Sequence, residues 1–86
     1  MDNSKENLRE QIDCIDSQIS LLLQKRFECV KQIGQFKKQY GLVVKDEKRE
    51  LKVLENVTKN FQDESEKEAV KHIYLVIIEE CIKAQK

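Results

Sequence analysis

The first half of the chain carries one long helical repeat of apolar residues. Steps of three, four or their sums separate successive apolar positions, and this period places side chains on one face of an α-helix. Asn3, with Glu6 three residues later, can form a capping box, and Gly41 can take the left-handed position beyond a helix C-terminus. These signals predict one helix of about 37 residues, which is roughly 55 Å long. The repeat consists of Leu8, Ile12, Ile15, Ile19, Leu22, Val30 and Ile33.

A helix of this length does not fit inside a compact domain made from the whole chain. The sequence has 86 residues, 40% of them apolar, which is enough for one small domain and no second one. Such a domain has a radius of gyration of roughly 12 Å and is about 30 Å across. Because the predicted helix is nearly twice that long, we expect another chain to cover part of its apolar face.

Two shorter helices are predicted in the second half of the chain. A short extended segment at 41–44 precedes Asp46, which can cap a helix over about 47–60. After a polar turn, Asp63 or Ser65 can start a third helix, since each is followed by Glu three residues later. The inward positions are Leu51, Leu54 and Val57 on the second helix and Val70, Ile73, Tyr74, Ile77, Ile78, Cys81 and Ile82 on the third.

The composition is that of a helical protein and excludes several other classes. There is no proline, there are two glycines, and 37% of the residues are charged, whereas sandwiches, barrels and collagen-like repeats need turn formers. We therefore predict a single all-α domain over residues 1–86. Sixteen basic residues balance sixteen acidic ones, so the excess positive charge expected of a general nucleic-acid binder is missing.

Neither the N-terminus nor the cysteines point to export, a membrane or a metal. The N-terminus is polar and lacks the apolar stretch of a secretory signal. The longest uncharged apolar run, 73–78, is far below the roughly 20 residues that span a bilayer. Three cysteines without CxxC spacing argue against disulfides and zinc and favour a reducing cytoplasm. The single histidine, His72, is interpreted as a surface residue.

Polar side chains on the apolar faces are the candidates for function, because burying a charge without a partner costs several kcal/mol. Arg26 and Lys37 share the apolar face of the first helix, roughly 16 Å apart along its axis and within about 20° of each other. Glu50 falls on the inner face of the second helix and Gln85 at the inner end of the third. Arg9 is about 25 Å from Arg26, so the two can serve one small ligand only across a two-fold dimer.

Each of these residues also has a structural interpretation. Long Lys and Arg stems often lie along apolar surface with their charged heads in water. Asp46 is most simply a helix cap, and Arg49 beside Glu50 can be an ordinary surface pair. The sequence offers no convincing Ser, His and Asp set and no Gly-rich phosphate loop, so covalent catalysis finds no support. Several cations with one acid and one amide suit a small dianionic ligand that carries a hydroxyl group.

Three stretches of the sequence match one family in order and spacing across nearly the whole chain. They are LREQIDCIDSQISLLLQKRFECVKQIGQFK, VVKDEKRELKVL and YLVIIEECIKAQ. Together they resemble the small all-helical chorismate mutases of the AroQ class. The resemblance implies three helices per subunit, with two very long first helices intertwined in a homodimer that holds two identical sites. It also implies the Claisen rearrangement of chorismate to prephenate in phenylalanine and tyrosine synthesis. No cofactor or metal is expected, and the length predicts a monofunctional enzyme.

The resemblance further implies a role for each candidate residue. Arg26, with Arg9 of the partner subunit, would bind the two carboxylates of the substrate. Lys37 and Gln85 would hydrogen-bond its ether oxygen, and Lys37 would also lie near a carboxylate. The remaining substrate-binding positions are Glu50 and the backbone at Asp46 for the ring hydroxyl, Arg49 beside them, and Cys81.

Cys81 departs from the commonest pattern of the relatives, in which a serine is frequent at this position. A thiol is a weaker hydrogen-bond donor than a hydroxyl, so a modest loss of substrate affinity is expected. Its interpretation as a small buried helix residue stays open beside the functional one.

Two other functions also stay open. An isochorismate pyruvate lyase on the same scaffold would likewise clamp carboxylates and use a lysine near the ether oxygen. A helical dimerisation module without catalysis would place Arg9, Arg26 and Lys37 in ion pairs between chains. A hydroxyl-binding acid at Glu50 favours the mutase over the lyase.

Overall fold

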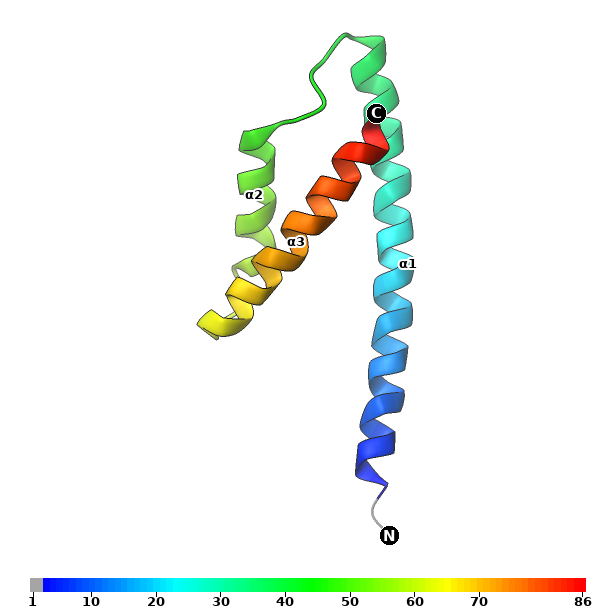
Figure 1. Ribbon diagram of the computed structural model, residues 1–86, viewed down its shortest axis with the longest axis vertical. Helices are drawn as coiled ribbons and strands as arrows, with labels where there is room; N and C mark the ends of the chain where they lie inside the picture. The colour runs from blue at the N-terminus through cyan, green and yellow to red at the C-terminus, as the bar shows by residue number, and fades with distance from the viewer. Residues whose placement is uncertain (1–2) are drawn as a thin grey trace.

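The computed structural model describes residues 3–86 and contains three helices. They are α1 (Ser4–Gln39), α2 (Glu47–Thr58) and α3 (Glu64–Gln85), with no strand in that described range (Figure 1). The prediction of a three-helix, all-α chain is therefore confirmed. Helix α1 has 36 residues, and α2 ends at Thr58 rather than at the expected Asn60.

The two shorter helices begin at aspartate caps. At the start of α2, Asp46 Oδ1 accepts a hydrogen bond from the Arg49 N–H at 3.1 Å. At the start of α3, Asp63 Oδ1 accepts from the Ser65 N–H at 2.8 Å. Each cap satisfies a backbone donor that has no partner within its helix. The prediction of Asp46 and Asp63 as caps is confirmed, and the alternative start at Ser65 is wrong.

The two ends of α1 differ in how well the sequence predicts them. Asn3 is the N-cap residue, but its side chain makes no capping hydrogen bond, so the expected capping box with Glu6 does not form. Its ψ of 17° lies outside the extended region from which a cap side chain reaches the first turn. At the other end, Gly41 has a φ of 64°, and the Leu42 N–H donates to the Lys37 carbonyl at 2.7 Å. This pattern closes the helix with the predicted left-handed glycine.

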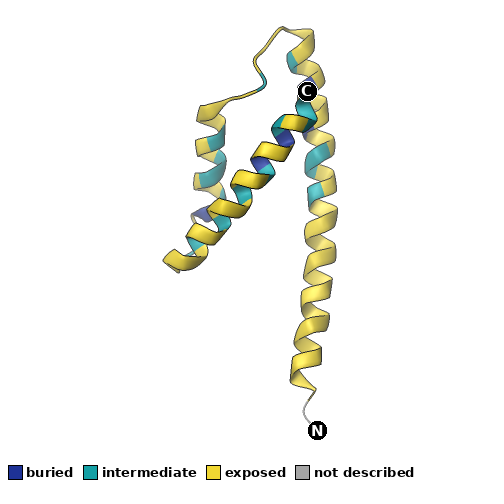
Figure 2. Cartoon of the chain, in the orientation of Figure 1, coloured by how far each residue is buried: buried dark blue, intermediate teal, exposed yellow. Residues whose placement is uncertain are grey.

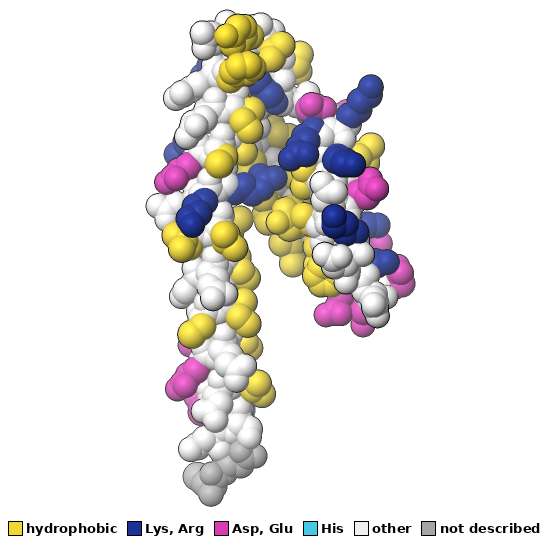
Figure 3. Space-filling view, turned by 180° about the vertical axis from the view of Figure 1, so that it is seen from behind, with side chains coloured by type: hydrophobic (Ala, Val, Ile, Leu, Met, Phe, Trp, Pro, Cys, Tyr) yellow, Lys and Arg dark blue, Asp and Glu magenta, His cyan; other side chains and the backbone are white. Residues whose placement is uncertain are grey.

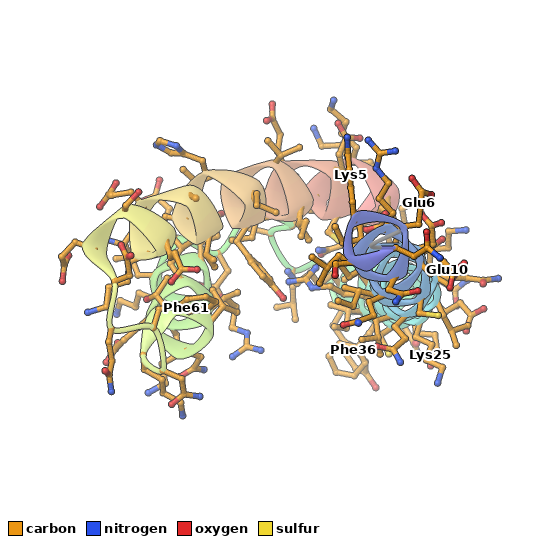
Figure 4. The ribbon with its side chains drawn as sticks, turned by 90° about the horizontal axis from the view of Figure 1, so that it is seen from below. Lys5, Glu6, Glu10, Lys25, Phe36 and Phe61 are labelled. Atoms are coloured by element: carbon orange, nitrogen blue, oxygen red, sulfur yellow. The ribbon has the colours of Figure 1, made fainter. Side chains whose placement is uncertain are left out.

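Helix α3 lies diagonally between the other two helices and packs against both (Figure 1). Its first half lies along α2, and its C-terminal end crosses α1. Viewed from below, α3 covers one side of α1, and Phe36 projects on the opposite side (Figure 4). The N-terminal part of α1 extends alone beyond the other helices, so the molecule measures 62 × 26 × 16 Å.

The buried part of the molecule is small and lies where α3 meets its neighbours (Figure 2). Val30 of α1 and Ile78 and Cys81 of α3 form the buried apolar set. Thr58 is buried at the end of α2, where its hydroxyl donates to the Leu54 carbonyl at 2.7 Å. A core this small leaves most of the apolar side chains exposed.

The exposed apolar side chains include two that were expected to be buried, Leu51 and Ile73. Leu54 and Val57 of α2 are half-buried, as predicted, but Leu51 is 68% exposed and Ile73 of α3 is 59% exposed. Both expectations are wrong for the single chain, because Leu51 and Ile73 lie outside the faces on which α2 and α3 pack against their neighbours. The whole N-terminal stripe of α1 is also exposed, at Leu8, Ile12, Ile15, Ile19 and Leu22.

The chain exposes far more surface than a compact monomer of its size. Its accessible surface is 7316 Å², whereas a folded monomer of 10.2 kDa exposes about 5300 Å². Its radius of gyration is 16.7 Å, compared with roughly 12 Å for a compact domain of this length. A single chain therefore leaves the N-terminal part of its first helix uncovered.

Candidate active site

The three helices line a cavity of about 430 Å³ beside the C-terminal half of α1. Six of the eight residues predicted to form a site line this cavity. They come from regions far apart in the sequence, since α1, the first turn of α2 and the last turn of α3 each contribute. The six are Arg26, Lys37, Asp46, Arg49, Glu50 and Gln85, with Cys29, Val30, Ile33, Val44, Val53, Ile78 and Ile82 completing the wall.

Helix α1 places two half-buried cations at the cavity. Arg26 Nη1 donates a hydrogen bond to Cys81 Sγ at 2.7 Å. Lys37 Nζ donates to the Val44 carbonyl at 2.7 Å, which ties it to the segment between α1 and α2. A guanidinium has five N–H donors and an ammonium has three. Both side chains are therefore held in place and keep donors for a ligand.

The first turn of α2 contributes one further cation and two carboxylates. Glu50, whose side chain is 21% exposed, pairs with Lys45 Nζ at 3.1 Å. The Asp46 carboxylate accepts the capping hydrogen bond from the Arg49 N–H. Both carboxylates therefore already interact with a positively polarised group.

Three cations at the cavity have no carboxylate partner. Within residues 3–86, Arg26, Lys37 and Arg49 take part in no ion pair. In the space-filling view, Lys and Arg side chains gather where α1 faces α2 (Figure 3). Charge-assisted hydrogen bonds to such cations are stronger than neutral ones. The cavity is therefore suited to a ligand that carries more than one negative charge.

Helix α3 contributes an amide that lacks a partner. Gln85 Oε1 is fully buried and accepts no hydrogen bond from the described residues. Leaving a buried acceptor unsatisfied costs about 1–3 kcal/mol. Because Gln85 lines the cavity, a donor that enters the cavity can satisfy it.

The other two predicted site residues do not line the cavity. Cys81 is 4% exposed and is linked to the cavity through its contact with Arg26. Arg9 lies on the free part of α1, where its side chain is 60% exposed and pairs with Glu6 at 3.2 Å. A single chain therefore does not bring Arg9 to the other candidates.

Three residues that shape the site escape the sequence analysis. Lys45 pairs with Glu50. Its position just before the Asp46 cap, close to the first turn of α2, could have suggested this pair. Gly34 packs against Gln85, and a glycine inside a helix suggests close packing. Val44 acts through its backbone carbonyl, so its side chain could not have revealed it.

Residues 3–86 contain neither a candidate metal site nor a candidate membrane span. No group of three or more His, Cys, Asp or Glu side chains there is arranged to hold a metal ion. No helix in that range has the length and hydropathy needed to cross a membrane. His72 is exposed, as predicted, and Cys14, Cys29 and Cys81 are free thiols.

A cavity between helices that presents cations, an acid and an amide is typical of a protein that binds a small dianion. The chain belongs to the chorismate mutase type II family, whose profile matches residues 8–86. The predicted resemblance to chorismate mutases is therefore confirmed.

Two individual proteins are similar to the chain over its full length. It is 33% identical over 90 residues to a bifunctional chorismate mutase/prephenate dehydratase from Aquifex aeolicus (strain VF5). The chain spans only 25% of that relative's length. A conserved hypothetical protein from Pyrococcus furiosus has a TM-score of 0.83 and 32% identity, and the match covers 100% of both chains. The same fold therefore occurs in a chain of similar extent.

Proposed function

We propose that this chain catalyses the Claisen rearrangement of chorismate to prephenate. The observation that carries the proposal is one cavity lined by three cations without a carboxylate partner in residues 3–86, Arg26, Lys37 and Arg49. The same cavity is lined by Gln85, whose side-chain amide also carries an N–H₂ donor. Chorismate carries two carboxylates, an ether oxygen and a ring hydroxyl, which need these donors and one acceptor. Membership of the chorismate mutase family supports the same reaction.

Arginines select the reactive shape of the substrate. The enolpyruvyl arm of chorismate must fold over the ring before the reacting carbons can meet. Arg26 binds one carboxylate and Arg9 of the partner subunit binds the other. Because a guanidinium binds a carboxylate through two parallel hydrogen bonds, each arginine fixes an orientation as well as a position. Holding both ends at set positions converts a rare conformer into the bound one.

The first turn of α2 receives the ring hydroxyl. Glu50 accepts its hydrogen bond together with the backbone at Asp46. The Glu50 carboxylate pairs with Lys45 at 3.1 Å, and an ionised carboxylate is a hydrogen-bond acceptor only. Arg49 lies in the same turn and adds positive charge for the nearby substrate carboxylate.

Lys37 and Gln85 supply the catalytic stabilisation. As the ether C–O bond breaks, a C–C bond forms between the enolpyruvyl methylene and the ring, and no atom or electron enters or leaves. Negative charge grows on the ether oxygen in the transition state. An ammonium and an amide N–H that are already in place stabilise that charge more than they stabilise the ground state. The hydrogen bond from Lys37 to Val44 supports this preorganisation.

The proposal includes a homodimer in which residues 1–86 form one domain of each subunit and the first helices intertwine. The accessible surface of 7316 Å² exceeds that of a compact monomer by about 2000 Å², and obligate dimers bury total areas of roughly 2000–5000 Å². The exposed stripe that includes Ile12 and Ile15 supplies an apolar face for this contact. Antiparallel pairing of α1 with its copy would carry Arg9 toward the partner's cavity.

The test is to follow chorismate absorbance with purified protein and to identify the product by NMR. We expect prephenate as the product. We also expect thermal stabilisation by a rigid bicyclic diacid shaped like the transition state, because a ligand that binds only the folded state raises its stability.

Isochorismate is assayed in parallel to separate the related activities. Faster release of pyruvate from isochorismate than of prephenate from chorismate would replace the mutase with a lyase. A folded dimer that neither consumes chorismate nor binds the diacid would indicate a dimerisation module.

A further inference from the structure

Gly34 lies on the face of α1 that the last turn of α3 crosses. It is buried, and a β-carbon added to it would lie 2.6 Å from the backbone oxygen of Gln85 and 2.8 Å from its Cα. These are backbone atoms, which no side-chain rotation can move away. A larger residue at position 34 must therefore push α1 and α3 apart or displace the end of α3.

Backbone conformation does not account for this glycine. Gly41 has a φ of 64° and nothing within 4 Å of an added β-carbon, so it serves the turn after α1. Gly34 has no positive φ and sits inside a long helix, where glycine lowers helix stability relative to alanine. Close packing is the property that explains glycine at position 34.

The residue that touches Gly34 also carries an amide at the cavity. Gln85 Oε1 is buried without a partner in the described chain, and Gln85 and Lys37 both line the cavity. Lys37 follows Gly34 by three residues, so it lies about 60° around and roughly 4.5 Å along α1 from the contact. The contact at Gly34 therefore sets how far the amide from α3 lies from the ammonium from α1.

We propose that Gly34 is a positioning residue that holds Gln85 beside Lys37. This inference rests on the proposed function, in which Gln85 and Lys37 stabilise the charge on the ether oxygen. Gly34 has no side chain and acts only by letting the two backbones approach. A displaced donor loses more of its interaction with the transition state than with the bound substrate. Filling position 34 therefore lowers kcat and changes KM little.

The kinetic test is a double-mutant cycle of Gly34→Ala and Gln85→Ala with chorismate as the substrate. In the natural background, Gly34→Ala is expected to lower kcat by about 10- to 100-fold with KM within about threefold. In the Gln85→Ala background, the same change is expected to alter kcat by less than about twofold, because the displaced amide is already absent. Equal losses of kcat in both backgrounds would overturn the proposal.

Gln35→Ala is the matched control. Gln35 is the next residue of α1 and is exposed, so an added alanine there does not meet α3. We expect its kcat to match that of the natural chain. A loss of kcat as large as that of Gly34→Ala would mean that alanine in this turn acts through α1 alone, and the proposal would be wrong.

A melting experiment tests the steric contact without using activity. A chain shortened to end at Ala84 lacks the Gln85 backbone atoms that the β-carbon would meet. Gly34→Ala is expected to lower Tm by at least about 5 °C in the full chain and by much less in the shortened chain. If Gly34→Ala does not fold in the full chain, it is expected to fold in the shortened one. Equal destabilisation in both chains would contradict the contact.

Failure of this inference is distinguishable from failure of the proposed function. If the natural chain does not convert chorismate, the proposed function fails, and the melting comparison still decides whether position 34 must be glycine for Gln85 to pack. If the natural chain is active and the cycle is additive, the proposed function stands and the role of Gly34 is wrong.

Discussion

The two halves of α1 carry the same apolar repeat in opposite surroundings. In the C-terminal half, Val30 and Gly34 are buried against α3, and Arg26 and Lys37 are half-buried. In the N-terminal half, every residue over 4–21 is exposed (Figure 2). The apolar repeat is denser in the exposed half than in the packed half, where Arg26 and Lys37 interrupt it, so the difference in burial comes from the absence of a neighbouring helix. An apolar repeat thus predicts that a face will be covered and leaves open which chain covers it.

The two arginines of the proposed carboxylate clamp repeat this contrast. Arg26 is half-buried, and its Nη1 is held at 2.7 Å from Cys81 Sγ. Arg9 is exposed and, among residues 3–86, forms an ion pair with Glu6, one turn earlier on the same helix. An exposed i,i+3 pair stabilises a protein by less than about 1 kcal/mol. Arg26 is therefore positioned by its own chain, whereas the proposed role of Arg9 requires a second copy of the chain.

The largest effect is expected from a charge in the exposed half. Ile15→Asp would bury a carboxylate in each copy of the proposed dimer, and each costs several kcal/mol. We expect monomers by analytical ultracentrifugation and a loss of activity of more than about 10³-fold, because the partner's arginine no longer reaches the cavity. Ser17→Asp, at another exposed position of the same half, is the control and should stay dimeric. An active Ile15→Asp dimer would mean that the exposed half of α1 is not covered by a partner chain at Ile15.

The next largest effect is expected in the packed half. Lys37→Ala should lower kcat by at least about 10²–10³-fold, the usual loss for one donor to a developing oxyanion, and should leave the dimer intact. Lys38→Ala removes the same charge from the exposed neighbouring position and should change kcat little. Activity of Lys37→Ala within a few-fold of the natural chain would refute the role of this ammonium.

Mixing two inactive variants tests whether the N-terminal half of one α1 and the C-terminal half of its partner's α1 contribute to one site. Arg9→Ala and Arg26→Ala chains, each inactive alone, should recover about a quarter of the natural activity after subunit exchange at equal concentration. Half of the dimers are then hybrids, and each hybrid has one site with both arginines. Exchange is checked by native mass spectrometry. No recovery in proven hybrids would mean that the two arginines do not share a site.

The fold was predictable where local chemistry decides it. The aspartate caps of α2 and α3 and the left-handed Gly41 are short-range signals, and the structure contains each of them. Leu51 was not predictable, because its burial depends on how α2 is rotated against α3, and the apolar period leaves that rotation free within the width of the stripe. The capping box at Asn3 failed for a similar reason, since its backbone angles are not determined by residue type.

The candidate site was predictable where a polar side chain interrupts an apolar face. Arg26, Lys37, Glu50 and Gln85 all interrupt such faces, and all four line one cavity. The backbone contacts were not predictable, because the Val44 carbonyl and the close approach at Gly34 depend on tertiary packing. A helical period places side chains around an axis but does not show which backbones touch.

The smallest effect is expected from removing the groups that hold the two arginines in place. Cys81→Ala removes the acceptor of Arg26 and is expected to raise KM for chorismate about fivefold, which corresponds to the loss of one hydrogen bond of about 1 kcal/mol. Cys81→Ser keeps an acceptor and should restore KM to near the natural value. Glu6→Ala removes the corresponding partner of Arg9 and should leave KM unchanged, because that pair is exposed. Equal KM values for Cys81→Ala and the natural chain would mean that the thiol does not hold Arg26. A raised KM for Glu6→Ala would mean that Arg9, too, is positioned by its own chain, and the contrast between the two halves of α1 would no longer hold.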